Sequence, residues 1–300
     1  MAIDINRGTT NVLLPPEVSK EIWQATQEAS VIQRLARRME LPGGGVDVPI
    51  ITGDPTAQWV AETDEKPVSR STFGTKNIKG YTMAVIEPFS NQFKRDLPAL
   101  YKALVERLPG VLAKKFDRTC LGFEASPGSG FDTLAGIPTV SVAGNVYDGF
   151  VSALASVADN EGDVEQWLLT AQAEIAALGA KDDIGRPLFI DSVTAQGTVN
   201  REILARPVVK SKHAYNAGTA SPAAPATLGF GGEWSTAVWG FVQGLTIDVS
   251  DQATLNDGGT PLNLWQRNMF AVRVEFEVGF AVRDKERFVR VTGAVPSSGS

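Results

Sequence analysis

The sequence predicts an α+β protein, in which helices and antiparallel strands follow one another without a regular βαβ order. Between residues 97 and 120, apolar side chains recur every three or four positions, which is typical of a helix with one buried face. From Val272 to Val278, apolar residues alternate with Arg273, Glu275 and Glu277, which is typical of a strand with one buried face. We find no internal repeat.

The first 40 residues are expected to be extended over 1–14 and helical over 15–40. Pro15 and Pro16 stand at the start of this helix, where proline is tolerated. Apolar residues follow at helical spacing, and arginines lie near the end that favours cations. Residues 41–45 (LPGGG) end the helix, and 46–51 (VDVPII) are expected to form a short strand.

The stretch from Trp59 to Ser90 predicts a two-stranded arm with little of its own to bury. Two strand-like runs, 57–61 and 78–89, flank a polar centre that lacks a tight hairpin turn. The helix over 97–120 follows, with Asp96 as a plausible N-cap. Pro109 removes a backbone donor and clashes one turn back, so a kink or break is expected near Leu108. A glycine-rich loop comes next.

The second half is expected to mix short elements. Its predicted order is a helix over 147–158, a strand over 167–170, a helix over 171–178 ended by Gly179, a turn and strand over 181–190, a mobile loop over 211–232, two strands over 234–249 with a turn near Gly244, a polar turn over 256–261, a long strand within 268–293 and a loose tail.

Composition limits the classes of function. The 300 residues carry a formal net charge of −6, which argues against broad binding to a phosphate backbone. A single cysteine, Cys120, excludes an internal disulfide and fits a reducing cytoplasm. The N-terminus lacks the apolar core of a signal peptide, and no apolar run is long enough for a membrane helix. We expect no membrane association.

No motif predicts catalysis, a cofactor or a metal. His213, the one histidine, falls in the predicted mobile loop and is expected to be solvated, since a catalytic histidine needs a rigid partner. Cys120 is expected to be a buried apolar residue. The adjacent Asp182 and Asp183 lie on a turn, where hydrogen bonds to the turn are commoner than metal binding. The glycine-rich PGSG and GFGG segments lack the context of a phosphate loop or a dinucleotide site.

Several segments together resemble the major capsid proteins of tailed bacteriophages, which share the Hong-Kong-97-type capsid fold. The arm (WVAETDEKPVSRSTFGTKNIKGYTMAVIEPFS) precedes a long helix (DLPALYKALVERLPGVLAKKFDRTCLGF) that runs into a glycine-rich loop. QWLLTAQAEIAALGAKDDIGRPLF is similar to the family's strand, helix and Asp-x-x-Gly-Arg turn. GGEWSTAVWGFVQGLTIDVSDQAT and LWQRNMFAVRVEFEVGFAVRDKERFVRV resemble its closing strands. The resemblance spans about residues 10–292. It rests on the order in which the motifs follow one another along the chain.

The resemblance implies a domain organisation and a site. The implied parts are 1–40, an N-terminal arm with a short helix; 41–52, a peripheral-domain strand; 53–92, the extended loop; 93–129, the peripheral domain with its spine helix; 130–256, mostly the axial domain, with part of the helical segment open to the peripheral domain; 257–293, closing strands of the peripheral domain; and 294–300, a tail. The loop would lie across a neighbouring subunit through Trp59, Glu62, Asp64, Glu65, Lys66, Arg70 and Phe73.

It also implies partners. Copies would form the hexamers and pentamers of an icosahedral shell that encloses double-stranded DNA without sequence-specific binding, assembled in the host cytoplasm and found in the virion. Only about ten residues precede the N-terminal arm, so a separate scaffolding protein is expected, together with a portal. Binding of decoration proteins is left open. Some relatives weld subunits by an isopeptide bond, for which Lys66, Lys76 and Lys79 and the acceptors Asn263 and Asn268 are candidates.

Two alternatives stay open on sequence alone. One is an encapsulin-like nanocompartment, which has the same fold and holds enzyme cargo in place of DNA. The other is a soluble enzyme or carbohydrate-binding domain that uses Trp234, Trp239 and Trp265. Tryptophans at this spacing are more often core or interface residues, so the capsid interpretation is favoured over both.

Overall fold

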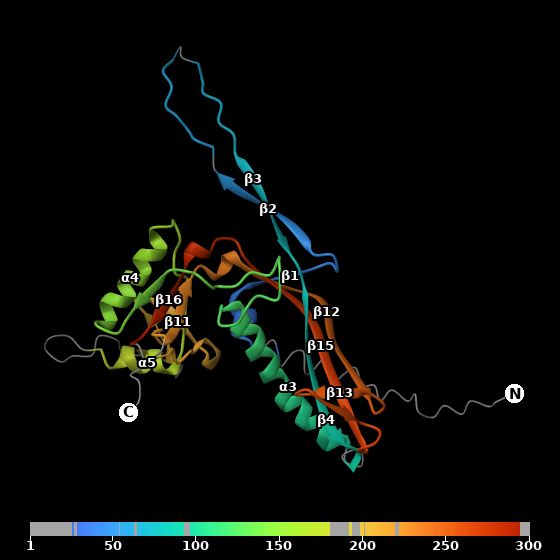
Figure 1. The fold of residues 1–300 in the computed structure, drawn as a ribbon. Helices are drawn as coiled ribbons and strands as arrows, with labels where there is room; N and C mark the ends of the chain where they lie inside the picture. Colours follow the sequence, from blue (N-terminus) through green and yellow to red (C-terminus); the bar gives the residue numbers. More distant parts are fainter. Residues whose placement is uncertain are drawn as a thin grey trace.

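The computed structural model describes residues 26, 29–53, 55–62, 65–92, 97–180, 192–193, 199–200, 202–219 and 222–294. These residues form two β-sheets with helices packed beside them, and an arm that projects from the body (Figure 1). The described residues do not include Asp96, 1–25, 181–191 or the tail from 295 onwards, so the expectations for these residues lie outside the described residues.

A long four-stranded sheet runs beside the longest helix. Its strand order is β1–β12–β15–β4, with β1 at Arg37–Glu40, β12 at Ala237–Ser250, β15 at Met269–Val282 and β4 at Tyr81–Ser90. Helix α3, Leu97–Cys120, lies along this sheet (Figure 1). The alternation expected in β15 is confirmed, because Val272, Val274, Phe276 and Val278 are all buried while Arg273 is exposed.

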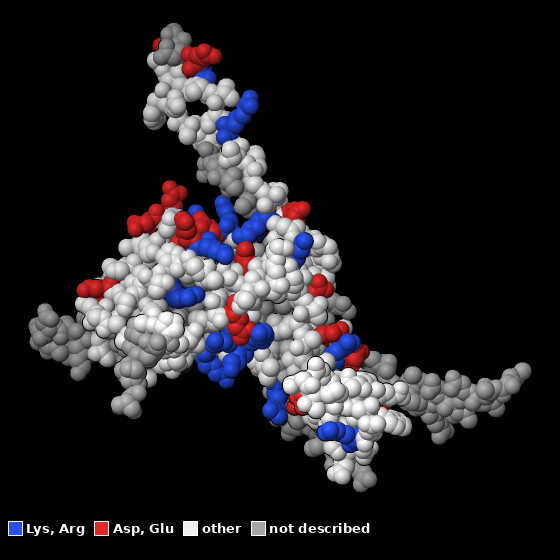
Figure 2. Space-filling view, viewed as in Figure 1, with Lys and Arg blue, Asp and Glu red and all other residues white. Residues whose placement is uncertain are grey.

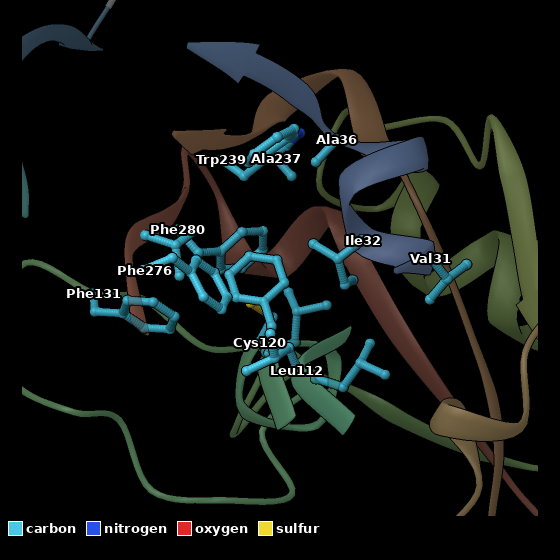
Figure 3. Packing of buried hydrophobic residues seen from close by; sticks show 14 of the residues in the cluster. Val31, Ile32, Ala36, Leu112, Cys120, Phe131, Ala237, Trp239, Phe276 and Phe280 are labelled. Carbon is cyan, nitrogen blue, oxygen red and sulfur yellow. The ribbon is translucent and has the colours of Figure 1, made fainter. Parts of the chain in front are cut away.

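The core between α3 and this sheet is largely aromatic. Leu112 and Cys120 from α3 gather with Phe131, Phe276 and Phe280 (Figure 3). Phe116 makes edge-to-face contacts with Phe131 and with Phe280, with ring centroids 6.5 Å apart in each pair. These contacts span residues far apart in sequence, so the core fixes the helix against the sheet.

A second sheet has six short strands and its own core. Its order is β5–β16–β11–β6–β10–β9, with β5 at Thr139–Ser141, β16 at Phe288–Thr292, β11 at Thr227–Gly232, β6 at Gln166–Leu169, β10 at Arg206–Lys210 and β9 at Glu202–Ile203. Helices α4, Val146–Ala158, and α5, Ala171–Leu178, pack against it. The sequence predicted α5 and the strand before it, and Thr170 begins the helix by accepting from the backbone N–H of Ala173.

The arm is a hairpin of β2, Val46–Gly53, and β3, Thr72–Ile78, with residues 55–62 and 65–71 outside any strand. The predicted strand over 57–61 is therefore wrong, because β2 supplies that side of the arm. The predicted strand over 78–89 is divided at Lys79 and Gly80: β3 pairs with β2, whereas β4 pairs with β15. The root of the arm thus continues directly into the long sheet.

The predicted helix over 15–40 is wrong at its end. Helix α2 covers Val31–Leu35 and stops at Ala36, which is extended. Arg37–Glu40 then form β1, which runs parallel to β12 from Val238 to Phe241. The open edge of β12 offers backbone partners that a longer helix could not use, so tertiary pairing overrides local helix propensity.

The expected break at Pro109 does not occur, since α3 continues as one helix through it. Leu108, Leu112 and Phe116 are buried on either side of the proline. Their packing offsets the one backbone hydrogen bond that proline removes.

Two predicted loops are ordered elements. Within 211–232 lie η3, Lys212–Ala214, two isolated bridges and β11, which is buried along its whole length. The predicted turn near Gly244 is absent: β12 is one strand whose pairing with β15 shifts register between Phe241 and Thr246. Both segments find strand partners far away in the sequence, which a local pattern cannot reveal.

The closing run also differs from the expected single strand. After β15, η5 (Lys285–Arg287) turns the chain, and β16 joins the six-stranded sheet beside β11. The polar turn at 256–261 is the tip of a small hairpin of β13, Thr254–Asp257, and β14, Thr260–Asn263. Gly258 and Gly259 at its centre both have positive φ, as a two-residue hairpin turn of type I′ requires. The remaining elements are η4, Trp234–Thr236, β7, Ser192–Val193, and β8, Val199–Asn200.

Candidate functional site

The arm presents large apolar side chains to solvent. Trp59, Val68 and Phe73 have relative exposures of 104%, 85% and 71%. Exposed apolar side chains of this size do not stabilise a monomer, because each one forgoes the free energy of burial. The arm is built like one half of an interface.

The charged residues expected on the arm are exposed as well. Glu62, Glu65, Lys66 and Arg70 all lie on its surface, and Asp64 lies outside the described residues. Figure 2 shows acidic side chains at the far end of the arm and basic ones where it meets the body. Within the arm, the Thr56 backbone N–H donates to Ser69 Oγ at 2.7 Å, which ties the two sides of the loop together.

The root of the arm is fastened to the body by a lysine. Lys76 Nζ on β3 lies 2.6 Å from Asp132 Oδ2 and also donates to the carbonyl of Val282. Asp132 Oδ2 accepts from the Val282 backbone N–H at 2.9 Å. A small apolar cluster around Leu41, Ile78 and Ala281 packs beside this network. The direction of the arm is therefore set by contacts at its base.

A cavity of about 430 Å³ opens beside this root. Its walls come from the base of the arm, from β1, from η4 and the residue before it, and from the ends of β12 and β15: Arg37, Val48, Pro49, Lys76, Ile78, Glu233, Ser235, Thr236, Val238, Ala281, Val282 and Arg283. The carboxylate of Glu233 lies 2.9 Å from Arg287 Nη1. This hydrogen bond raises the pKa of Arg287 from its ordinary value.

The candidates for a covalent cross-link occupy different environments. Lys66 and Lys79 are exposed, whereas Lys76 is engaged by Asp132. Asn263 Oδ1 accepts from the Gln266 backbone N–H, and Asn268 Oδ1 accepts from Asn91 Nδ2 at 2.7 Å. The two asparagines flank the β14–β15 connection, at the opposite end of the molecule from the tip of the arm (Figure 1). Within one chain, Lys66 and these asparagines are not brought together.

His213 is not the solvated loop residue that the sequence predicted. It is buried in η3, and its Nδ1 lies 2.7 Å from Oδ2 of Asp117 on α3, which is fully buried. The same carboxylate accepts from Ser30 Oγ at 2.6 Å and from the backbone N–H groups of Val31 and Ile32. Asp117 therefore joins the start of α2, the helix α3 and η3. Sequence reasoning missed this network because its members are about 90 residues apart.

One expectation about isolated residues is confirmed, one is met in part, and one falls outside the described residues. Cys120 is fully buried, and burial, followed by the charge of Asp117, raises the pKa of its thiol well above the usual value. Trp234 and Trp239 are core residues, with 1% and 3% exposure, whereas Trp265 is 71% exposed. Asp182 and Asp183 lie outside the described residues.

Arg290 is a second connection that the sequence did not indicate. From β16 it donates through Nη2 to the carbonyls of Leu121 and Leu134, and its guanidinium lies 5.5 Å from the ring centroid of Phe230. Burial lowers its pKa. It links the six-stranded sheet to the end of α3.

Two kinds of site are absent from the described part of the chain. It contains no group of three or more His, Cys, Asp or Glu side chains placed to hold a metal ion. Nor does it contain a helix of the length and apolar character that crossing a bilayer would require. What the structure does offer is surface: an exposed arm with a fastened root, and a cavity beside that root.

An α+β body with a projecting hairpin arm, a long helix along one sheet and a second sheet with its own core defines a structural subunit of a shell. Residues 10–293 match the family described as "Phage capsid family". The chain belongs to this family.

Individual relatives agree with that membership. The chain is 33% identical over 304 residues to "Probable major capsid protein gp17" of Mycobacterium phage D29, covering 95% of this chain and 92% of the relative. A solved structure from Gordonia phage Cozz is similar with a TM-score of 0.68 and 22% identity, covering 89% of this chain and 87% of that one. A second, from Mycobacterium phage Adephagia, has a TM-score of 0.70 and 19% identity, covering 89% and 91%.

The predicted family and fold are therefore confirmed: the chain is a phage capsid protein with the capsid fold of tailed phages. These matches do not favour the encapsulin-like alternative. The alternative based on three tryptophans is not favoured either, since two of them are core residues.

Proposed function

We propose that this chain is the major capsid protein of a tailed phage, and that its copies form the hexamers and pentamers of an icosahedral head around double-stranded DNA. The observation that carries the proposal is the arm, whose apolar and charged side chains have no surface of their own chain to pack on. Ordering such an arm costs about 1–2 kcal/mol per residue in backbone entropy, and an isolated hairpin is marginal in water. Burial against a neighbour, repeated around a symmetric ring, offsets this cost.

The two sheets suggest how the subunit is divided. We assign α3 and the four-stranded sheet to a peripheral domain, and the six-stranded sheet with α4 and α5 to an axial domain that meets its copies at the symmetry axes. The sequence predicted a boundary between the axial and peripheral domains at residue 256, and we now assign two strands differently. We place β12 with the peripheral domain and β16 with the axial domain, because each strand pairs in that sheet.

We infer that the shell contains DNA without binding it through specific contacts. The net charge of −6 suits a wall that does not adhere to phosphates. The protein needs no cofactor for this role, and we propose that it has no enzymatic activity. A separate scaffolding protein, a portal and decoration proteins are proposed partners, with assembly in the host cytoplasm. Coexpression with neighbouring phage genes tests the first of these: efficient closed shells of uniform size from the chain alone would count against a scaffold.

A covalent weld between subunits is a further part of this proposal, through Lys66 or Lys79 of one copy and Asn263 or Asn268 of another. Lys76 is the weakest donor, because its ammonium is held by Asp132. The lysine Nζ would attack the asparagine Cγ and displace Nδ2 as ammonia. This reaction needs a neutral lysine and a nearby carboxylate that takes a proton from the attacking nitrogen and passes it to the leaving one. Mature shells boiled in detergent would run as covalent oligomers if the weld exists, and as a single monomer band if it does not.

Electron microscopy and light scattering of the chain coexpressed with neighbouring phage genes test the proposed function. We expect shells, and double-stranded DNA that resists DNase in particles purified from infected cells. A monomer at high concentration, with the arm ordered against its own body, would contradict the proposal. Particles filled with a protein cargo in place of DNA would point to a nanocompartment.

A further inference from the structure

The cavity beside the arm root carries uncompensated positive charge. Of the four charged residues in its lining, Lys76 is paired with Asp132 and Glu233 is paired with Arg287. Arg37 and Arg283 remain, both exposed, and neither has an acidic partner among the described residues. Figure 2 shows Lys and Arg gathered in this region, where the arm joins the body.

Apart from Ser235 and Thr236, the rest of the lining is apolar. Val48 and Ile78 come from the base of the arm, and Val238, Ala281 and Val282 come from the long sheet. A volume of about 430 Å³ lies within the range typical of pockets that bind small molecules, so the cavity has room for a large side chain. An apolar pocket with two arginines at its rim suits a segment that combines an apolar side chain with carboxylates.

The far end of the arm has this combination. Residues 57–66 contain Glu62, Asp64 and Glu65 against one lysine, so this segment is net acidic. Trp59 is fully exposed three residues before Glu62, and neither Glu62 nor Glu65 has a basic partner among the described residues. The two surfaces are complementary in charge and in polarity.

The tip of the arm does not reach the cavity of its own chain. The arm extends away from the body (Figure 1). Lys76, in the cavity wall, is eleven positions from Glu65 along the chain, which corresponds to about 35 Å of extended chain. The partner surface must therefore come from another copy. A contact between two different patches of identical chains is heterologous, and such contacts close into rings when the rotation between copies allows it.

We propose that the tip of the arm, through Glu62, Glu65 and Trp59, docks into the cavity bounded by Arg37 and Arg283 of the next copy in a head-to-tail ring. Glu62 and Glu65 approach the two arginines, and the Trp59 side chain packs on the apolar wall. This inference rests on the proposed shell function and specifies which surface of the neighbour receives the arm.

Paired charge reversals test the docking in the full-length chain. The tip variant is Glu62→Lys with Glu65→Lys, the cavity variant is Arg37→Glu with Arg283→Glu, and the third carries all four changes. We expect each pair alone to lower the yield of shells about tenfold or more, and the combination to recover most of that loss, since opposite charges face each other again. Matched controls are Asp257→Lys, on the β13–β14 hairpin, and Arg267→Glu, both exposed and away from the proposed contact.

The outcomes separate this inference from the proposed function. If the unmodified chain forms no shells under any condition, the proposed function fails. If it forms shells and the reversals leave the yield unchanged, or the combination recovers nothing, the docking is wrong while the shell function stands. If the cavity variant assembles normally but packages less DNA, the two arginines bind DNA phosphates, and the proposed docking is again wrong. Thermal unfolding of the unassembled variants shows whether each one still folds.

A disulfide provides a second measurement that does not depend on charge. Glu62→Cys with Arg283→Cys, oxidised after assembly, is expected to give a ladder of covalent dimers, trimers and larger species, because each copy then links to two neighbours. Glu62→Cys with Asp257→Cys is the control and is expected to give no ladder. A ladder that is absent, or that stops at the dimer, would overturn the head-to-tail contact. The native Cys120 is buried and does not interfere.

Discussion

His213 Nδ1 lies 2.7 Å from Asp117 Oδ2, and both side chains are buried. Because the carboxylate accepts, the hydrogen belongs on Nδ1 of the imidazole. The same carboxylate receives three more donors from Ser30, Val31 and Ile32, so it caps α2 while it anchors η3. One buried group thus holds together α2, α3 and η3.

Replacing Asp117 by Asn is expected to lower the free energy of unfolding by about 3 kcal/mol, since an amide presents one acceptor oxygen where four donors converge. Urea or thermal unfolding of the unassembled chain measures this. Asp159→Asn, at the exposed end of α4, is the matched control and should change stability by about 0.5 kcal/mol or less. Equal effects of the two variants would show that the network contributes little.

Cys120 is expected to be chemically silent in the folded chain. Its thiol is fully buried and its pKa is raised, and the thiolate is the form that reacts. At pH 8 we expect labelling by a thiol reagent to be about 100-fold slower than in urea. A cysteine at the exposed position of Val68 provides the comparison and should react at the rate of a free thiol. Rapid labelling of Cys120 without unfolding would contradict its placement.

The same raised pKa predicts an alkaline loss of stability. An unfolded thiol ionises near pH 8.5, whereas the buried thiol stays protonated to a higher pH. Above pH 8.5 the unfolded state therefore binds fewer protons, and the thiol's contribution to stability falls by up to about 1.4 kcal/mol per pH unit. Unfolding of the native chain and of Cys120→Ala, compared between pH 7 and pH 10, isolates this slope. Parallel curves would show that the thiol ionises equally in both states.

Elements with a strong local pattern could be predicted from the sequence. Helix α5 begins at a capping threonine and ends at Gly179, and β15 alternates over its central residues, so neither requires knowledge of the rest of the chain. Strand β1 follows α2 after a single residue. Its two arginines are typical of the last turn of a helix, so the local sequence favours a longer helix over a strand. It is a strand because it pairs with β12. This pairing depends on the tertiary fold, so the local sequence could not predict it.

The candidate site shows the same division. The exposure of Trp59 and Phe73 could be anticipated, because the residues around them are polar and include no tight hairpin turn. The cavity could not, since Arg37, Lys76 and Arg283 come from separate parts of the chain. The burial of His213 depends on a carboxylate 96 residues away in sequence.

Lys76→Met is expected to loosen the root of the arm. It removes the ion pair with Asp132 and the hydrogen bond to Val282, which join β3 to the body. Backbone amides of β2 and β3 should then exchange with deuterium about tenfold faster, because local opening costs less. Lys79→Met is the matched control, since Lys79 is exposed and has no ion pair among the described residues. If both variants exchange alike, the ion pair does not set the stability of the root.

The glycines of β11 are expected to be irreplaceable for steric reasons, although their sequence predicts a loop. A Cβ at Gly231 would lie 2.4 Å from the Trp167 ring, which itself packs against Phe150. Gly231→Ala must therefore push the indole out of the core, and we expect a loss of about 1–3 kcal/mol, seen as a lower melting temperature. Gly144→Ala, where a Cβ meets nothing within 4 Å, should leave stability nearly unchanged. A silent Gly231→Ala would mean that Trp167 has room to move, and that the strand is held by its backbone pairing with β6 and β16 alone.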